Sequence, residues 1–124
     1  MQIPKPSDAD KEYFRSVVPD EPGVEIKAMF GNLGAFVNGN MFMGLFGEAV
    51  GVRLDEHDRE RLLAQDGAGP FGPVERPMGG YVSLPVAWRT APAKTRRWID
   101  IAFTQVSLLP PKQKPARKAK APKS

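Results

Sequence analysis

The spacing of apolar residues changes between a helical and a strand period, and each change marks the end of an element. Residues 8–18 carry apolar side chains at helical spacing, after a capping-box-like Ser7 and before Pro19, and they predict a short first helix. From Val24 the period falls to two, which is typical of a strand with one better-buried face.

Four short apolar runs then follow one another and predict strands over residues 24–30, 33–37, 41–46 and 49–54. Asn38-Gly39, between the second and third runs, is a strong hairpin signal because both residues tolerate positive φ. Connections this short leave no room for the crossovers that parallel strands need. The four runs therefore predict an antiparallel meander.

The second half of the chain adds two helices and one strand. Asp55 is placed to cap a helix that ends near Gly67, residues 81–84 form a last strand, and a closing helix begins at Thr90 or Thr95. The order helix, four strands, helix, strand, helix predicts an α+β domain of two layers. We expect an antiparallel sheet, a four-stranded meander plus one later strand, with the helices packed on one face.

The third strand is expected to present different side chains on its two sides. Strict alternation places Phe42 and Phe46 on one side and Met41, Met43 and Leu45 on the other. Since helices cover one face only, the uncovered face should carry either the phenylalanines or the methionines. An apolar patch of this kind commonly marks a partner or dimer surface, which favours an interaction module.

The amino-acid composition excludes several kinds of chemical site. The 124 residues suit one domain, and with no cysteine and one histidine they exclude disulfides, thiolate ligands and paired imidazoles. His57 lies among acidic residues and is expected on a solvated helix face, while Gly44, Gly47 and Gly51 fit no phosphate-loop spacing and are expected at bends and turns. We therefore expect no catalytic, cofactor-binding or metal-binding residues and no enzymatic activity.

The net charge of +4 comes entirely from the last fifteen residues. Removing their six cations from the eighteen Lys and Arg leaves twelve against fourteen Asp and Glu in residues 1–109. The sequence predicts a single folded domain over 1–109 and a disordered Lys/Pro/Ala tail over 110–124. The tail is interpreted either as a solubilising terminus or as a non-specific nucleic-acid arm formed by Lys112, Lys114, Arg117, Lys118, Lys120 and Lys123.

Two further patterns bear on location. The first ten residues contain no apolar run, and the most apolar stretch, residues 41–52, is twelve residues long and includes Glu48. A signal peptide needs an apolar run near the start of the chain, and a membrane helix needs about 20 apolar residues. We expect a cytoplasmic protein with no membrane partner.

Several short motifs together resemble the N-terminal domain of the TfoX/Sxy family, from about Ser7 to Leu109. The positions that carry the resemblance are Met29, Phe30, Gly31, Gly34, Phe36, Phe71, Tyr81, Leu84, Pro85 and Trp98. The resemblance implies a two-layer domain with an antiparallel sheet and a structural role for these positions. Full-length members are bacterial regulators of natural competence with a helical C-terminal domain; here a basic tail stands in its place, so the chain resembles a stand-alone member.

Three hypotheses for the function stay open at this point. The first is a small, non-enzymatic interaction or regulatory module that binds a protein partner or forms a homodimer through its sheet surface. The second is a nucleic-acid-associated regulator of the competence or transcription type that uses the basic tail. The third is a ligand-binding protein with a pocket near Gly31, Phe71 and Tyr81.

Overall fold

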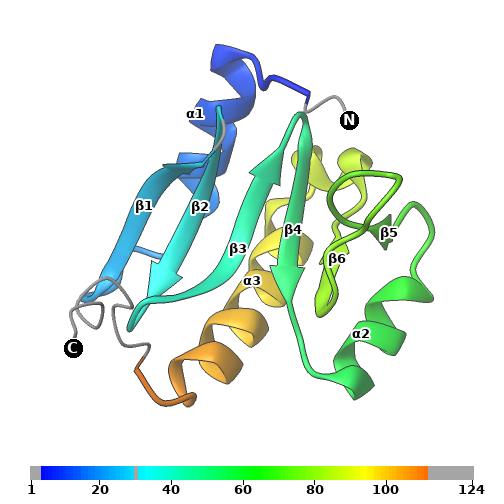
Figure 1. Ribbon diagram of the computed structural model, residues 1–124. Coiled ribbons are helices and arrows are strands. Elements are labelled where there is room, and N and C mark those ends of the chain that lie inside the picture. The colour runs from blue at the N-terminus through cyan, green and yellow to red at the C-terminus, as the bar shows by residue number, and fades with distance from the viewer. Residues whose placement is uncertain (1–3, 30, 112–124) are drawn as a thin grey trace.

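The computed structural model describes residues 4–29 and 31–111, and in these ranges the chain forms one antiparallel sheet and a layer of helices (Figure 1). The elements, in chain order, are α1 (Asp8–Val17), β1 (Val24–Met29), β2 (Asn32–Val37), β3 (Asn40–Phe46), β4 (Ala49–Arg53), α2 (Glu56–Leu63), β5 (Gly69–Pro70), β6 (Tyr81–Ser83), the 3-10 helix η1 (Val86–Thr90) and α3 (Pro92–Ser107). The strand order is β1-β2-β3-β4-β6-β5. The predicted α+β class with an antiparallel sheet is confirmed.

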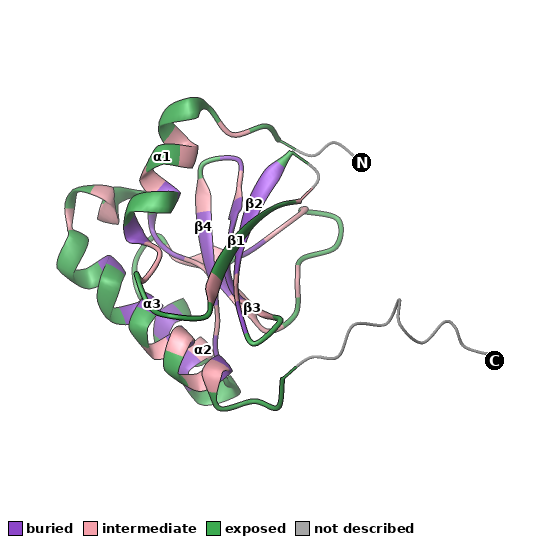
Figure 2. Ribbon diagram, turned by 90° about the vertical axis from the view of Figure 1, so that its left-hand side faces the viewer, coloured by how far each residue is buried: buried purple, intermediate pink, exposed green. Residues whose placement is uncertain are grey.

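The helices pack on one side of the sheet, and β1 is the edge strand at the opposite end of the sheet from β5 (Figures 1 and 2). Two details differ from the sequence-based expectation. The two-residue strand β5 pairs with β6 and extends the sheet beyond the predicted five strands. The closing helix begins at Pro92 rather than at Thr90 or Thr95, because proline suits the first helical turn, where its missing N–H has no intrahelical partner.

Helix α1 begins with the predicted capping box. The Ser7 hydroxyl accepts a hydrogen bond from the Asp10 N–H at 3.0 Å, and the Asp10 carboxylate accepts one from the Ser7 N–H at 2.9 Å. The Ser7 N–H bond, together with Arg89 at 2.9 Å, holds the pKa of Asp10 below its ordinary value of 3.8. Arg89 also donates to the Glu48 carbonyl, so it ties α1 to the turn between β3 and β4.

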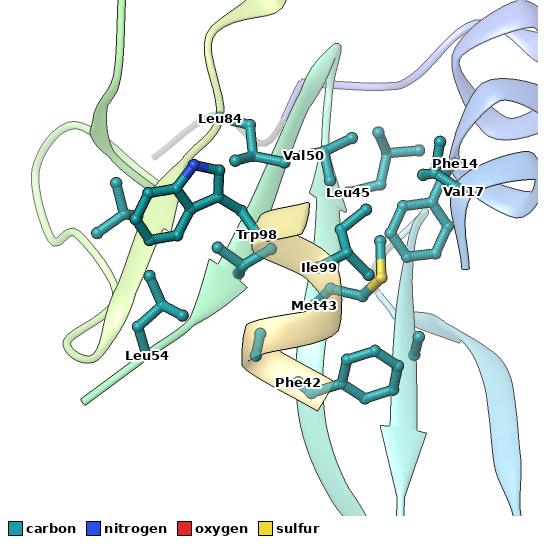
Figure 3. Packing of buried hydrophobic residues seen from close by; sticks show 14 of the residues in the cluster. Phe14, Val17, Phe42, Met43, Leu45, Val50, Leu54, Leu84, Trp98 and Ile99 are labelled. Atoms are coloured by element: carbon teal, nitrogen blue, oxygen red, sulfur yellow. The ribbon is translucent and has the colours of Figure 1, made fainter. Parts of the chain in front are cut away.

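The main hydrophobic core lies between the helices and the sheet (Figure 3). Phe14 of α1 and Ile99 of α3 are almost fully buried against Met43 and other strand residues. Trp98, which the sequence places on the apolar stripe of the last helix, is 6% exposed, with the Arg61 guanidinium 5.2 Å from its ring. This core fixes which face of the sheet the helices cover.

The expected alternation along β3 is wrong, because the strand contains an irregularity. Ala35 pairs with Met43 while the next residue of β2 pairs with Met41, which leaves Phe42 as an extra residue. Phe42 is fully buried and packs edge-on against Phe103 of α3, with ring centroids 5.3 Å apart. Phe42 and Met43 therefore both belong to the helix-side core, and Met41 is left on the opposite face with Phe46.

No helix in the part of the chain that the structure describes is long and apolar enough to cross a membrane.

Candidate binding surface on the open face of the sheet

The face of the sheet opposite the helices, here called the open face, is covered only in part. Strand pairing and burial place Met29, Phe36 and Met41 on this face at the β1 side. At the β6 side, residues 71–80 fold back over the sheet and are closed by a hydrogen bond from the Met78 N–H to the Phe71 carbonyl at 2.8 Å. The open face thus has a covered half and an uncovered half.

A row of three glycines crosses the sheet on the open face. Gly34 of β2 pairs with Gly44 of β3, and Gly44 pairs with Gly51 of β4. Since none of them has a side chain, the three strands form a shallow trough at this level. The trough is a consequence of register and cannot exist without the irregularity that brings Gly34 opposite Gly44.

Both ends of the glycine row are filled by side chains that lie directly on the backbone. A Cβ at Gly51 would lie 2.3 Å from ring carbons of Phe71, which is only 2% exposed. A Cβ at Gly34 would lie 2.8 Å from the Met29 sulfur and 2.9 Å from the Met41 sulfur. The Phe71 ring requires glycine at position 51, whereas a Cβ at position 34 would require the two methionine side chains to shift.

Between the two filled ends the trough stays open as a groove of about 280 Å³ above Gly44. This groove, called the open-face groove below, is lined mainly by Met29, Met41, Met78, Phe46, Phe71 and Pro73. Its polar lining residue is Asn32, which is 5% exposed. The Asn32 amide donates to the Pro4 carbonyl at 3.1 Å and accepts from the Gly47 N–H at 2.9 Å, so it is engaged in holding two loops.

The two walls of the groove differ in stiffness. On one side Phe71 is held by Phe46, with ring centroids 6.2 Å apart, and by Tyr81, at 6.0 Å. The Tyr81 hydroxyl donates to the Met41 carbonyl at 3.1 Å, and burial raises the pKa of this phenol. The other side is made of unbranched methionine side chains, which adapt to the shape of what they contact.

A second, wider hollow of about 590 Å³ lies where β4 meets α2 and the end of α3. Polar groups around it bond to one another: the Gln105 side-chain carbonyl accepts from the Asp55 N–H at 2.8 Å, and Arg59 donates to the Leu54 carbonyl at 2.7 Å. The Gln105 amide also donates to the Asp58 carboxylate, which Arg61 contacts. These bonds brace α2 against α3, and we assign them a structural role.

The positions that carry the family resemblance lie in different parts of the domain. Met29, Gly34, Phe36, Phe71 and Tyr81 come together on the open face, from the three strands β1, β2 and β6 and the 71–80 segment. Leu84 and Trp98 belong to the helix-side core, Pro85 is buried just before η1, and Gly31 has φ +83° in the turn between β1 and β2. Phe30 and the six tail cations lie outside the described residues.

One expectation about sites needs correction, that for the glycines of strands β3 and β4. Of the residues expected near a pocket, Phe71 lines the open-face groove, Tyr81 packs against the Phe71 ring, and Gly31 is not among the lining residues. Gly44 and Gly51, expected at bends, lie inside strands; only Gly47 of that set is in a turn, with φ +64°. His57 lies exposed in the first turn of α2, as expected.

The fold and the groove together define a small α+β domain with a helix-covered sheet face and an opposite face that carries an apolar hollow. The family model of the TfoX N-terminal domain matches residues 13–106, about three quarters of the chain. The chain therefore belongs to the TfoX N-terminal domain family, as its sequence motifs suggest. No curated protein matches the chain at a significant level.

Proposed function

We propose that this domain is a non-enzymatic interaction and regulatory module that binds a protein partner through the open-face groove. The observation that carries the proposal is an apolar groove above a glycine row, on the face that the helices leave uncovered. The occupant is an aromatic or branched apolar side chain of the partner. Membership of the TfoX N-terminal domain family is consistent with a regulatory role.

The chemistry of the lining supports an apolar side chain as occupant. Methionine, phenylalanine, proline and glycine dominate the groove, and the two polar ends of the Asn32 amide are already bonded. An apolar cavity of about 150 Å³ is large enough to hold benzene, so a groove of about 280 Å³ has room for a phenylalanine or tryptophan ring. Burying such a ring contributes about 1.5–3 kcal/mol to binding before the entropic cost of association.

The proposal is tested with peptides displayed from a random library. Binders are selected on the full chain and then compared on a Gly44→Leu variant, whose added side chain would start at ordinary contact distance from Phe71 and extend into the groove. We expect the selected peptides to share one aromatic or branched apolar residue and to lose at least about tenfold in affinity for the variant. Peptides that bind both proteins equally would contradict the proposal.

A second function is favoured by the distribution of charge. The six cations after Pro110, with no acidic residue among them, suit a non-specific arm of a nucleic-acid-associated regulator. If all six engage duplex DNA, the logarithm of the affinity should fall with the logarithm of salt concentration with a slope near about −5. A full-length variant with the six cations replaced by glutamine should lose this binding, and unchanged affinity would refute the arm.

A further inference from the structure

Strand β1 is an edge strand with unusual exposure. In the part of the chain that the structure describes, β1 lies at the end of the strand order and pairs with β2 alone. Ile26 is 39% exposed and its neighbours Glu25, Lys27 and Ala28 are also exposed, which Figure 2 shows as green along most of the strand. An edge strand of six residues presents a row of backbone groups to which another strand can pair.

The register of the β1–β2 hairpin shows which backbone groups point outward. Met29 faces Asn32 across a two-residue loop, a position at which the two residues exchange both hydrogen bonds. Hydrogen-bonded and non-hydrogen-bonded pairs alternate from there, so the N–H and C=O groups of Ile26 and Ala28 point away from β2. The Val24 N–H fits this alternation, because it donates to the Glu21 carbonyl at 3.2 Å instead of to β2.

The same register assigns the side chains of β1 to the two faces. Glu25 and Lys27 lie on the open face, where their charged groups are 3.8 Å apart and the Lys27 ammonium is 5.1 Å from the Phe36 ring centroid. Ile26 and Ala28 lie on the opposite side, towards the helix layer, where they are left exposed beyond its edge. The strand therefore carries one charged face and one apolar face.

From this pattern we propose that two copies of the chain associate by antiparallel pairing of β1 with β1, centred on Ile26. In that register each Glu25 lies opposite the Lys27 of the other copy, which creates two cross-strand pairs of opposite charge on the open face. On the other face Ile26 meets its own counterpart and Val24 meets Ala28, which covers the exposed apolar side chains. The charge pattern of the strand is complementary to itself in this register.

The outward-pointing backbone groups of β1 can form hydrogen bonds in this same register. The outward N–H and C=O groups of Ile26 exchange both hydrogen bonds with the Ile26 of the other copy. Each Ala28 N–H donates to the Val24 carbonyl opposite, which accepts no hydrogen bond from the residues that the structure describes. Hydrogen bonding, charge and apolar burial thus all select the pairing centred on Ile26. The result is one continuous sheet of two copies, with both open-face grooves on the same side.

The contact is small, because one six-residue strand from each copy covers less than the standard interface of about 1,600 Å². We therefore expect a reversible dimer that forms in the micromolar concentration range. Such a dimer is measured by sedimentation equilibrium of the full chain over that range.

Charge variants distinguish this pairing from other modes of association. Glu25→Lys alone places like charges opposite each other at both positions, and Lys27→Glu alone does the same with acids. Each single variant should raise the dimer dissociation constant about tenfold or more. The double variant Glu25→Lys with Lys27→Glu restores opposite pairs and should dimerise within about threefold of the original chain. The two residues are exposed, so none of the three variants disturbs the core.

A backbone variant gives an independent check. Ala28→Pro removes an N–H that points away from β2, so it leaves the hairpin bonds in place and abolishes one bond of the proposed pairing from each copy. This variant should be monomeric, with an unchanged fluorescence spectrum of its two tryptophans, Trp88 and Trp98, reporting an intact core. A chain that is monomeric throughout the micromolar range, or a dimer that the single charge variants and Ala28→Pro do not weaken, would overturn the inference.

Discussion

Two alanine substitutions in the glycine row should have opposite effects on stability. Gly51→Ala puts a Cβ 2.3 Å from the Cγ and Cδ1 carbons of Phe71. That ring is 2% exposed and is held between Phe46 and Tyr81, so it has little room to move. Gly44→Ala, one strand away in the same row, puts a Cβ 3.4 Å from the nearest Phe71 atom and 3.5 Å from the Met41 methyl, which are ordinary contacts.

The expected magnitudes follow from these distances. Replacing glycine with alanine reduces the conformational entropy of the unfolded chain and stabilises by about 0.4–1 kcal/mol when the site accepts the Cβ. Overpacking of a closely packed site costs about 1–3 kcal/mol. Gly51→Ala should therefore lower the free energy of unfolding by about 1–2 kcal/mol, whereas Gly44→Ala should raise it by about 0.4–1 kcal/mol.

Thermal unfolding followed by circular dichroism measures both effects. For a domain of this size 1 kcal/mol shifts Tm by about 4 °C, so Gly51→Ala should lower Tm by about 4–8 °C and Gly44→Ala should raise it by about 2–4 °C. Adding Phe71→Leu to Gly51→Ala should cost less than the two separate effects combined, since the smaller side chain relieves the clash. Equal shifts for the two alanine variants would refute the packing of Phe71 on Gly51.

Two further predictions concern groups around the groove. Tyr81→Phe removes the hydrogen bond to the Met41 carbonyl and should lower the free energy of unfolding by about 0.5–1.5 kcal/mol. Burial raises the Tyr81 pKa above its ordinary value of 10.0, so the folded state binds the phenol proton more tightly than the unfolded state does. The free energy of unfolding should therefore fall as the pH rises above 10.0. The fall should be smaller in Tyr81→Phe, which has no phenol proton to lose. Asn32→Ala leaves the buried Gly47 N–H without its acceptor and the Pro4 carbonyl without its donor. Urea unfolding should therefore show a free energy of unfolding lower by about 1–3 kcal/mol. An unchanged urea midpoint would exclude a role of Asn32 in holding the two loops.

Local patterns are sufficient to predict most of the elements. The capping box at Ser7 and the Asn38-Gly39 turn act between near neighbours, and both occur as predicted. The same is true of the cap at Asp55, whose carboxylate accepts from the Asp58 N–H at 2.9 Å. Each signal concerns a few adjacent residues, so it needs no knowledge of tertiary packing.

The faces of β3 could not be predicted, because an extra residue puts Phe42 and Met43 on the same face of the sheet. Nothing in the local sequence Met-Phe-Met distinguishes a bulged strand from a regular one. The bulged arrangement buries Phe42 against Phe103, a residue far away in the sequence, so local patterns carry no signal for it. It also decides the register with β2, and with it the position of Gly34 opposite Gly44.

Of the two pairings in the glycine row, the one between Gly44 and Gly51 could have been predicted from the sequence. A two-residue turn at Gly47-Glu48 places Phe46 opposite Ala49, and counting back along both strands brings Gly44 opposite Gly51. Paired glycines inside adjacent strands indicate a close approach by another part of the chain. The identity of that part, Phe71, depends on the path of the glycine- and proline-rich segment, which has no periodic pattern to indicate its position.

Methyl NMR of a chain labelled at the methionine methyl carbons tests whether the open face is the binding surface. Toluene and indole serve as probes, because they are the ring systems of phenylalanine and tryptophan side chains. We predict saturable shifts of the methyl signals of Met29, Met41 and Met78, which line the groove, while Met43, fully buried in the helix-side core, stays unchanged. Unshifted groove methionines, or a Met43 signal that moves as far as theirs, would contradict binding at the open face.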